Sequence, residues 1–232
     1  MKTILRDGLQ EMGVPFTEET LENLLRYYAL LDEKNKVMNL TAITGEEATA
    51  RLHFLDCAAL LKFFPLKGKR LADIGAGAGF PGLVLRCLEP ELQLTMLDSL
   101  QKRVTFQQEV CDTLPLAGVV CRAGRAEEQA DMRGRYDFVT SRAVARLNML
   151  AELCLPMVKK GGYFVAMKGP AAGEELAEAE KAVRLLGGGK ARVIPYTIPG
   201  TDTEHTLVVI EKIAPTPPAY PRRFAQIKKS PL

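Results

Sequence analysis

The 232-residue sequence lacks any apolar run of roughly eighteen residues, the length that predicts a membrane-spanning helix. Its N-terminal segment, MKTILRDGLQEMG, is interrupted by charge before the apolar core of a signal peptide could form. Both absences argue against a secreted or membrane-bound protein. We therefore expect a cytoplasmic protein that does not associate with membranes.

Patterns typical of metal sites and disulfide frameworks are also missing. The chain has only two histidines, and its five cysteines are an odd number with no Cys-x-x-Cys pair among them. We expect these thiols to be buried or idle, and we expect no metal. The cysteines are Cys57, Cys87, Cys111, Cys121 and Cys154.

Acidic residues are absent from residues 213–232, although the net charge of the whole chain is only +3. A local excess of positive charge favours binding to phosphates and makes that binding sensitive to salt. One hypothesis is that this segment contacts RNA, and the alternative is a solvated, frayed tail. The basic residues concerned are Arg222, Arg223, Lys228 and Lys229.

The rest of the composition is ordinary for a globular protein, with 47% hydrophobic and 25% charged residues. This length predicts one large α/β domain with small appendages. We divide the chain into an N-terminal helical extension at 1–66, a main domain at 67–213 and a basic C-terminal tail at 214–232 that packs on or flanks the domain.

Two helices are predicted in the N-terminal extension. Leucines and tyrosines recur every three or four residues after Thr17, which is placed to cap the first helix. Thr44 and Glu47 have the spacing of a capping box and predict the start of a second helix. The loop VMNLTAI lies between them.

Short β-rich runs alternate with helix-length segments from about residue 70 onwards. RLADIG, QLTMLD, GVVCRA, YDFVTS and GYFVAMK predict parallel strands with helices on both faces. Only PGTDTE separates the last two runs, ARVIPYTI and HTLVVIEK, so these should form an antiparallel hairpin. A seven-stranded, mainly parallel sheet that ends in this way is typical of Class I S-adenosylmethionine-dependent methyltransferases, which have a Rossmann-like α/β fold.

The stretch LADIGAGAGFPG places a glycine-rich loop directly after the first strand. Such a loop borders the crevice in which open parallel sheets bind ligands, and its glycines let a ligand approach the backbone. Asp98 follows Gly77 at a spacing that NAD-binding proteins also use, so spacing alone does not exclude NAD. However, Phe80 and Pro81 would stand where a pyrophosphate must approach.

S-adenosylmethionine has no phosphate, so Phe80 and Pro81 would not obstruct its binding. Asp73 could then bind the ammonium of the methionine moiety, directly or through water, and loop amides could bind its carboxylate. Asp98 could accept both ribose hydroxyls. The alternative is that both acids only cap loops and that the glycines only make turns. The loop residues predicted to bind this cofactor are Gly75, Gly77, Gly79 and Phe80.

Further candidates follow the third and fourth strands. Ala126 and Glu127 should lie where adenine would bind, and Arg142 should enter the same crevice. The alternatives are a helix-start acid for Glu127 and a surface ion pair for Arg142.

Several segments resemble, in order and spacing, the bacterial glucose-inhibited division protein B family (RsmG), whose members methylate N7 of a guanine in 16S ribosomal RNA. These segments are RLHFLDCAAL, LADIGAGAGFPG, LDSLQKRVTF, SRAVARLNML and MKG, and the likeness extends from NLTAI to KKSPL. The resemblance implies an S-adenosylmethionine site with Asp98 on the ribose. The other matching residues are Gly75, Phe80, Ala126, Glu127 and Arg142.

The chain departs from the family at Ala76 and Ala78, where the loop often has threonine and proline. We expect a changed affinity at most, because the backbone makes the main contacts.

Methylation at guanine N7 requires no proton removal, because N7 already carries an in-plane lone pair. This agrees with the absence of an Asn-Pro-Pro-Tyr motif and of a recognisable catalytic cysteine. We expect positioning to do most of the work, with Arg142 and His53 as candidate catalytic residues. Arg51 and Lys168 are further candidates for RNA contact, and His53 could instead only pair with Asp56 along its helix.

The predicted partner is 16S ribosomal RNA or an assembly intermediate of the small ribosomal subunit, and we expect a monomer. The alternatives are a methyltransferase with a small-molecule or protein acceptor, a nicotinamide oxidoreductase, and a noncatalytic RNA-binding module.

Overall fold

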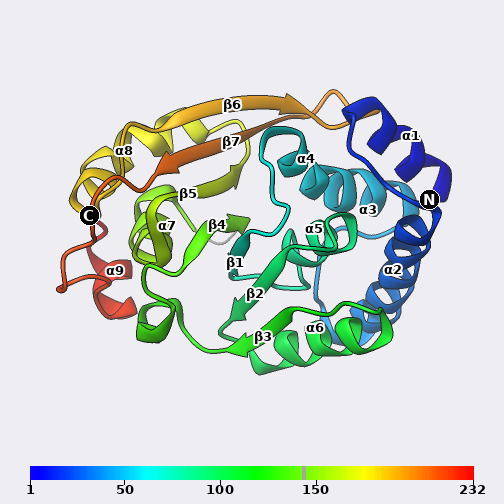
Figure 1. Cartoon of the computed structure of the whole chain (residues 1–232), viewed down its shortest axis with the longest axis horizontal. Coiled ribbons are helices and arrows are strands. Elements are labelled where there is room, and N and C mark those ends of the chain that lie inside the picture. Colours follow the sequence, from blue (N-terminus) through cyan, green and yellow to red (C-terminus); the bar gives the residue numbers. More distant parts are fainter. Residues whose placement is uncertain (143–144) are drawn as a thin grey trace.

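A seven-stranded sheet forms the centre of the computed structural model, which describes residues 1–142 and 145–232 (Figure 1). The strand order is β3-β2-β1-β4-β5-β7-β6. Neighbours from β3 to β5 are parallel, whereas β7 is antiparallel to both β5 and β6. The predicted parallel sheet and terminal hairpin are therefore confirmed. The strands are β1 (Arg70–Ile74), β2 (Gln93–Asp98), β3 (Val119–Ala123), β4 (Tyr136–Arg142), β5 (Val158–Lys168), β6 (Arg192–Thr197) and β7 (Glu204–Glu211).

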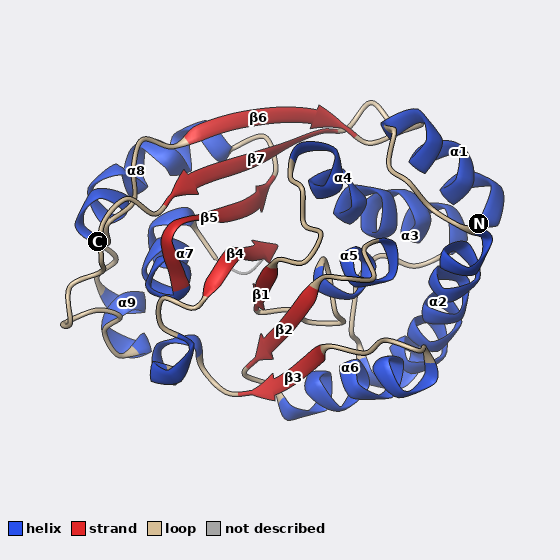
Figure 2. Cartoon of the chain, in the orientation of Figure 1, coloured by secondary structure: helices blue, strands red, loops and turns tan. Residues whose placement is uncertain are grey.

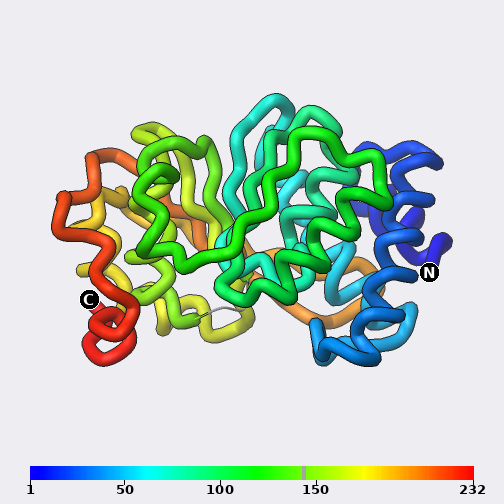
Figure 3. The backbone as a smooth tube through the Cα atoms, turned by 90° about the horizontal axis from the view of Figure 1, so that it is seen from below, coloured from blue at the N-terminus to red at the C-terminus, as the bar shows by residue number. Residues whose placement is uncertain are grey.

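Helices cover both faces of this sheet (Figure 2). The first group is α1 (Lys2–Met12), α2 (Glu18–Met38), α3 (Glu46–Thr49), α4 (Asp56–Phe63), α5 (Gly82–Leu88) and α6 (Gln101–Thr113). The second group is α7 (Leu147–Cys154), α8 (Ala172–Leu185) and α9 (Phe224–Lys229). The two groups lie on opposite sides, so the termini are at opposite ends of the molecule in both Figure 1 and Figure 3.

Alternation along the strands explains the two layers. In β5, Val165 belongs to the core shared with the first group of helices, whereas Phe164 and Ala166 belong to the core shared with the second group. Successive strand residues point to opposite faces, so apolar runs such as YFVAM bury both faces at once. The N-terminal extension packs into the first of these cores, and the predicted division at residues 66 and 213 stays a prediction.

The start of the first long helix was predicted correctly, and that of the second was not. The Thr17 side chain accepts a hydrogen bond from the Thr20 amide at 3.1 Å and caps α2. In contrast, α3 begins at Glu46 after Gly45, and no side chain caps it, so the capping box of Thr44 and Glu47 does not form. The helix then continues through a π-helical segment, Ala50–Leu55, into α4.

Candidate functional site

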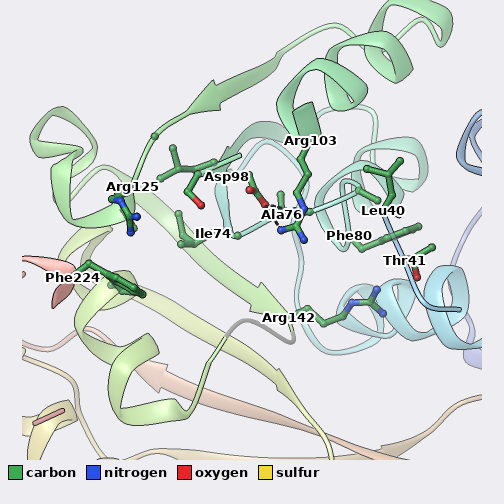
Figure 4. A pocket seen from close by; sticks show the side chains of 18 of the residues that line it. Leu40, Thr41, Ile74, Ala76, Phe80, Asp98, Arg103, Arg125, Arg142 and Phe224 are labelled. Carbon is green, nitrogen blue, oxygen red and sulfur yellow. Dashed lines mark hydrogen bonds and ion pairs between the residues drawn. The ribbon is translucent and has the colours of Figure 1, made fainter. Parts of the chain in front are cut away.

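A cavity of about 480 Å³ lies at the carboxyl ends of β1 and β2, where an open parallel sheet binds ligands. It extends from Phe80, Thr41 and Arg142 at one end to Arg125 and Phe224 at the other (Figure 4). Eight of the predicted site residues line it, namely His53 and seven others. Those seven are Gly75, Gly77, Phe80, Asp98, Ala126, Glu127 and Arg142.

The glycine loop begins at Gly75, directly after β1 ends at Ile74. Gly75 and Gly77 have φ angles of 72° and 58°, the left-handed region that other residues seldom adopt. Among the described residues no acceptor binds the amide of Ala78, which lines the cavity, so this N–H is available to a ligand. The loop can therefore bind an anionic group through its backbone.

Gly79 and Gly82 do not line the cavity. A Cβ on Gly79 would lie 2.4 Å from Leu83 Cδ1, and one on Gly82 would lie 3.0 Å from Asp73 Oδ2. These two glycines therefore allow close packing behind the loop. Gly79 was predicted to contact the ligand, whereas the structure places it in a packing contact behind the loop. Gly82 lets α5 pack closely against β1.

Two side chains from distant helices hold the loop in place. The Tyr27 hydroxyl donates to the carbonyl oxygen of Ala78 at 2.5 Å, and Gln107 Nε2 donates to that of Gly77 at 2.8 Å. Sequence analysis missed both residues, because no local pattern connects them to the loop.

The Asp98 carboxylate is buried at the end of β2 and joins the loop to α6. Its Oδ2 accepts from the Gly77 amide at 2.9 Å and from Arg103 Nη1 at 3.3 Å, and its Oδ1 accepts from the Leu100 amide at 3.0 Å. Asp98 and Arg103 both line the cavity (Figure 4). A carboxylate held this firmly is suited to accept hydroxyl donors from a ligand.

Asp73 lies fully buried behind the loop and does not line the cavity. Its Oδ2 accepts from the Gly82 amide at 2.8 Å, whereas its Oδ1 has no partner among the described residues. Burial raises the pKa of Asp73 to about 7, with only partial compensation from the Gly82 amide. The predicted ammonium contact stays a prediction, and the orphaned Oδ1 is an acceptor that such a donor or a bridging water would satisfy.

Arg142 links three groups at the end of the cavity that Phe80 and Thr41 also line. Its Nη1 donates to the carbonyl oxygen of Leu52 at 3.0 Å and to Asp56 Oδ2 at 2.9 Å, and its Nη2 donates to His53 Nδ1 at 2.6 Å. The guanidinium also lies 5.2 Å from the centre of the Phe80 ring. The two alternatives from the sequence, a surface ion pair for Arg142 and a direct pair between His53 and Asp56, are therefore wrong.

These bonds determine the tautomer of His53. Arginine can only donate, so Nδ1 of His53 is the acceptor and its proton lies on Nε2. Nε2 then donates to Thr41 Oγ1, 2.7 Å away. Since that oxygen also accepts from the Ile43 amide at 3.0 Å, the Thr41 hydroxyl proton is free to point into the cavity.

The loop that carries Thr41 is fixed from α2. Asn35 Oδ1 accepts from the Thr41 amide at 2.9 Å and Asn35 Nδ2 donates to the Thr41 carbonyl oxygen at 3.0 Å. The His53 ring stacks on Phe80, with ring centres 4.4 Å apart and the planes inclined by 14°. Both nitrogens of His53 have partners, so we regard it as a positioning residue that does not transfer protons itself.

The titration of His53 gives a first prediction. Burial, with the Arg142 charge, lowers the pKa of His53 to about 3 from its usual 6.5. The unfolded chain therefore binds a proton between these values that the folded chain does not, and His53 makes the fold less stable as the pH falls below 6.5. The difference in the free energy of unfolding between wild type and His53→Ala should become smaller by about 2 kcal/mol from pH 7 to pH 5. Urea denaturation at both pH values measures this difference. The same difference at pH 7 and at pH 5 would contradict a neutral, buried His53 ring.

The far end of the cavity is formed by the turn after β3 and by the C-terminal tail. Arg125, Ala126 and Glu127 line it together with Phe224 of α9, and the Arg125 guanidinium lies 5.1 Å from the centre of the Phe224 ring. The tail therefore contributes directly to the ligand cavity, a role that sequence analysis did not predict.

Arg222 fastens this tail to the body of the protein. Its Nε and Nη2 donate to the fully buried Glu152 at 2.9 and 2.6 Å, and its amide donates to the same carboxylate at 2.8 Å. These contacts occupy the guanidinium, so the structure does not favour the predicted phosphate contact at Arg222 or a frayed tail.

The other predicted RNA contacts fall into two groups. Lys168 is largely buried and pairs with Glu175 at 2.7 Å, and Arg51 pairs with Glu47 at 3.0 Å and donates to the Pro199 carbonyl oxygen at 2.8 Å. Arg223, Lys228 and Lys229 are exposed on or beside α9, and none of them forms an ion pair with another described residue. Of the predicted set, these three are the cations most available to an external phosphate.

Two further observations concern the described residues. No group of three or more His, Cys, Asp or Glu side chains there is arranged to hold a metal ion. Within the same residues, no helix combines the length and the apolar character needed to cross a membrane.

The cavity fits the expected cofactor, which is a zwitterionic amino acid joined through a sulfonium to adenosine. The free Ala78 amide provides a donor for a carboxylate, the buried Asp98 provides an acceptor for hydroxyls, and the orphaned Asp73 Oδ1 lies behind the same loop. Phe80 and Phe224 supply apolar surface at the two ends. These groups match the ligand in charge and in polarity.

Comparison with known families and proteins supports this assignment. Residues 20–199 match a family model described as GidB, rRNA small subunit methyltransferase G. Proteins named ribosomal RNA small subunit methyltransferase G are similar over almost the whole chain. The one from Lachnoclostridium phytofermentans is 47% identical and covers 97% of this chain and 95% of its own length, and the one from Clostridium botulinum (strain ATCC 19397 / Type A) is 42% identical and covers 99% and 98%.

Solved structures show the same fold at low sequence identity. A putative S-adenosyl-L-methionine-dependent methyltransferase from Methanococcus maripaludis has a TM-score of 0.59 with 14% identity, covering 81% of this chain and 92% of its own. A predicted O-methyltransferase from Agrobacterium tumefaciens has a TM-score of 0.55 with 16% identity, covering 77% and 95%. The predicted Class I methyltransferase fold is therefore confirmed.

Proposed function

Because this chain belongs to the GidB family of rRNA small subunit methyltransferases G, we propose that it transfers a methyl group from S-adenosylmethionine to N7 of a guanine in 16S ribosomal RNA. One observation carries the proposal beyond family membership. The glycine loop, the buried Asp98 and the turn at Ala126 and Glu127 all border one cavity at the carboxyl ends of the parallel strands.

The cofactor, when bound, supplies a methyl group activated by the positive sulfonium. On the protein side, the Ala78 amide would bind the carboxylate of the methionine moiety, and Asp98 would accept from the ribose hydroxyls. Ala126 and Glu127 line the part of the cavity suited to adenine, next to Phe224. Phe80 stays at the opposite end, fixed between the rings of His53 and Tyr27, with centres 4.4 and 5.3 Å away.

The protein needs no general base for this acceptor. Guanine N7 attacks with its lone pair and gains positive charge, so a bare cation beside the base would slow the reaction. The Asp56 carboxylate compensates the Arg142 charge at 2.9 Å, and His53 is neutral. These residues therefore orient the reactants without opposing the developing charge, and the rate enhancement comes mainly from positioning.

Exposed lysines and arginines on α9 should contribute to RNA affinity. Replacing Arg223, Lys228 and Lys229 together by alanine should weaken RNA binding several-fold and reduce the slope of log affinity against log salt by up to about three. Filter binding of a 16S RNA fragment between low and moderate salt measures this.

The matched control replaces three exposed lysines outside α9, Lys36, Lys62 and Lys67, and should leave the slope unchanged. Cofactor affinity should stay the same in both variants. An unchanged slope in the α9 variant would refute the phosphate contacts there.

The function is tested by incubating the purified protein with labelled S-adenosylmethionine and small-subunit RNA, followed by mapping of the labelled base. Label at guanine N7 supports the proposal, and label at any other atom refutes the stated acceptor. Titration with NAD serves as a parallel control, and tighter binding of NAD than of S-adenosylmethionine would refute the cofactor.

We also propose that a single chain acts in the cytoplasm, on either the RNA or an assembly intermediate of the small subunit. One chain supplies the loop, the acid and both ends of the cavity, and the named relatives are bacterial proteins of ribosomal RNA modification. Comparing transfer to naked RNA and to purified subunit precursors identifies the substrate form.

A further inference from the structure

A second cavity, of about 440 Å³, lies beside the first. It is bordered by the loop before α3, the π-helical segment, the start of α4, the ends of β4 and β5, and the start of β7. Its volume is in the range of ordinary small-ligand pockets. The described residues that line it are Ile43, Leu52, His53, Asp56, Arg142, Met167, Lys168, Gly169, Thr203 and His205.

The two cavities share two lining residues, His53 and Arg142. A ligand in the second cavity would therefore contact the same side chains that form one end of the cofactor cavity. Group transfer requires its two reactants to lie in contact, in a fixed orientation. A cavity that adjoins the cofactor cavity through the positioning residues is the place where an acceptor meets this requirement.

The walls of the second cavity suit a flat, partly polar ring. Ile43, Leu52 and Met167 provide apolar surface, and His205 and Thr203 provide polar atoms. Enzymes that modify a nucleobase hold the unstacked base between apolar side chains and bind its edge by hydrogen bonds.

His205 is oriented for such a contact by the Asp56 carboxylate. Asp56 Oδ1 accepts from His205 Nδ1 at 2.7 Å and from the Tyr196 hydroxyl at 2.6 Å, while Oδ2 accepts from Arg142. His205 therefore carries its proton on Nδ1, and Nε2 is the ring nitrogen left for a ligand. The same carboxylate thus holds both Arg142 and His205 in place, and sequence analysis missed His205 altogether.

Lys168 argues against a free phosphate as the occupant. Its ammonium donates to the carbonyl oxygen of Ala145 at 2.6 Å and pairs with Glu175 at 2.7 Å, so its charge is already compensated. The Arg142 charge is likewise compensated by Asp56. With both cations paired and the remaining wall largely apolar, a neutral base fits better than an anion.

We propose that this second cavity receives the acceptor guanine, unstacked from the RNA, with its faces against the apolar wall of Ile43, Leu52 and Met167 and its edge at His205. The inference rests on the proposed function, because it takes the acceptor to be a guanine. It adds the place where the base binds and the residues that contact it.

A filling substitution tests the cavity without disturbing the Asp56 network. Gly169 lines the second cavity, and a Cβ added there meets no atom of residues 1–142 or 145–232 within 4 Å. Gly173, at the start of α8, is exposed and equally open, and it lines none of the cavities described above. Gly169→Leu and Gly173→Leu therefore form a matched pair with the same added side chain.

Gly169→Leu should lower kcat/KM for the RNA by about 100-fold, as expected for a displaced acceptor, with the cofactor Kd within about twofold of wild type. Gly173→Leu should match wild type in both quantities. Equal kcat/KM for the two variants would overturn the proposal while the methyltransferase assignment remained.

A second measurement does not depend on turnover. Guanosine monophosphate at millimolar concentration, added to protein with ¹³C-labelled methionine methyl groups, should shift the Met167 resonance, which Met167→Leu identifies by its loss. The shift should disappear in Gly169→Leu and persist in Gly173→Leu. No shift in the wild-type protein, or the same shift in both glycine variants, would overturn the proposal. If the wild type transferred no methyl to RNA, the proposed function would fail and this titration would still decide whether the cavity binds the base.

Discussion

Asp98→Asn should lower the affinity for S-adenosylmethionine by about 100-fold while the protein stays folded. The carboxylate oxygens accept from the amides of Gly77 and Leu100, and both would also accept from ribose hydroxyls. An amide group would turn a donor toward one of these N–H groups and would bind one hydroxyl fewer. Losing one hydroxyl contact to the carboxylate, and replacing the charged acceptor of the other hydroxyl by a neutral one, costs about 3 kcal/mol, which corresponds to that factor.

Isothermal titration of the cofactor measures this affinity, and circular dichroism checks the fold. Asp112→Asn is the matched control, because Asp112 is exposed on α6 and lies outside the cavity lining. Both variants lose one negative charge, so a similar loss of affinity in the control would point to a general charge effect. Wild-type affinity in Asp98→Asn would show that Asp98 only supports the loop.

Arg142→Ala should reduce the free energy of unfolding by about 3 to 5 kcal/mol, the usual effect of removing one partner from a buried ion pair. The substitution leaves Asp56 Oδ2, His53 Nδ1 and the Leu52 carbonyl oxygen without their common donor. Methyl transfer should fall by at least about 100-fold, since both cavities lose a shared wall.

Arg142→Lys separates charge from geometry. Lysine keeps the positive charge beside Asp56, but its single nitrogen cannot reach the acceptors that the planar guanidinium contacts through Nη1 and Nη2. We expect it to restore much of the stability and little of the methyl transfer, measured by urea denaturation and single-turnover kinetics. Arg146→Ala is the control, because its exposed pair with Glu178 should contribute no more than about 1 kcal/mol. Full activity of Arg142→Lys would mean that only the charge is required.

Local patterns in the sequence predicted the sheet and one wall of the site. The sequence of neighbouring residues determines the short β-rich runs, the end of β1 at Ile74 and the position of Asp98 at the end of β2. These features could therefore be predicted correctly. The same holds for Ala126 and Glu127, which directly follow β3. The capping box at Thr44 failed because Gly45 adopts a φ of 86° and the helix starts after it.

The rest of the site depends on contacts between residues far apart in the chain. Tyr27 binds a carbonyl 51 residues away, His205 binds Asp56 149 residues away, and Arg222 binds Glu152 70 residues away. No spacing or period encodes such pairs, because only the assembled sheet brings them together. The positive charge of the C-terminal tail was therefore visible in the sequence. The buried Glu152 that binds Arg222, and the contribution of Phe224 to the cavity, were not.

The position of Phe224 also bears on the time at which the protein becomes competent during translation. Arg222 and Phe224 are synthesised after the strands and the glycine loop, because they follow them in the chain. Domains can fold while the chain is still growing. The sheet can therefore assemble on the translating ribosome, but the far wall of the cofactor cavity is complete only after residues 222–224 have emerged and packed against it. A nascent chain should thus acquire its fold before it acquires its full affinity for the cofactor.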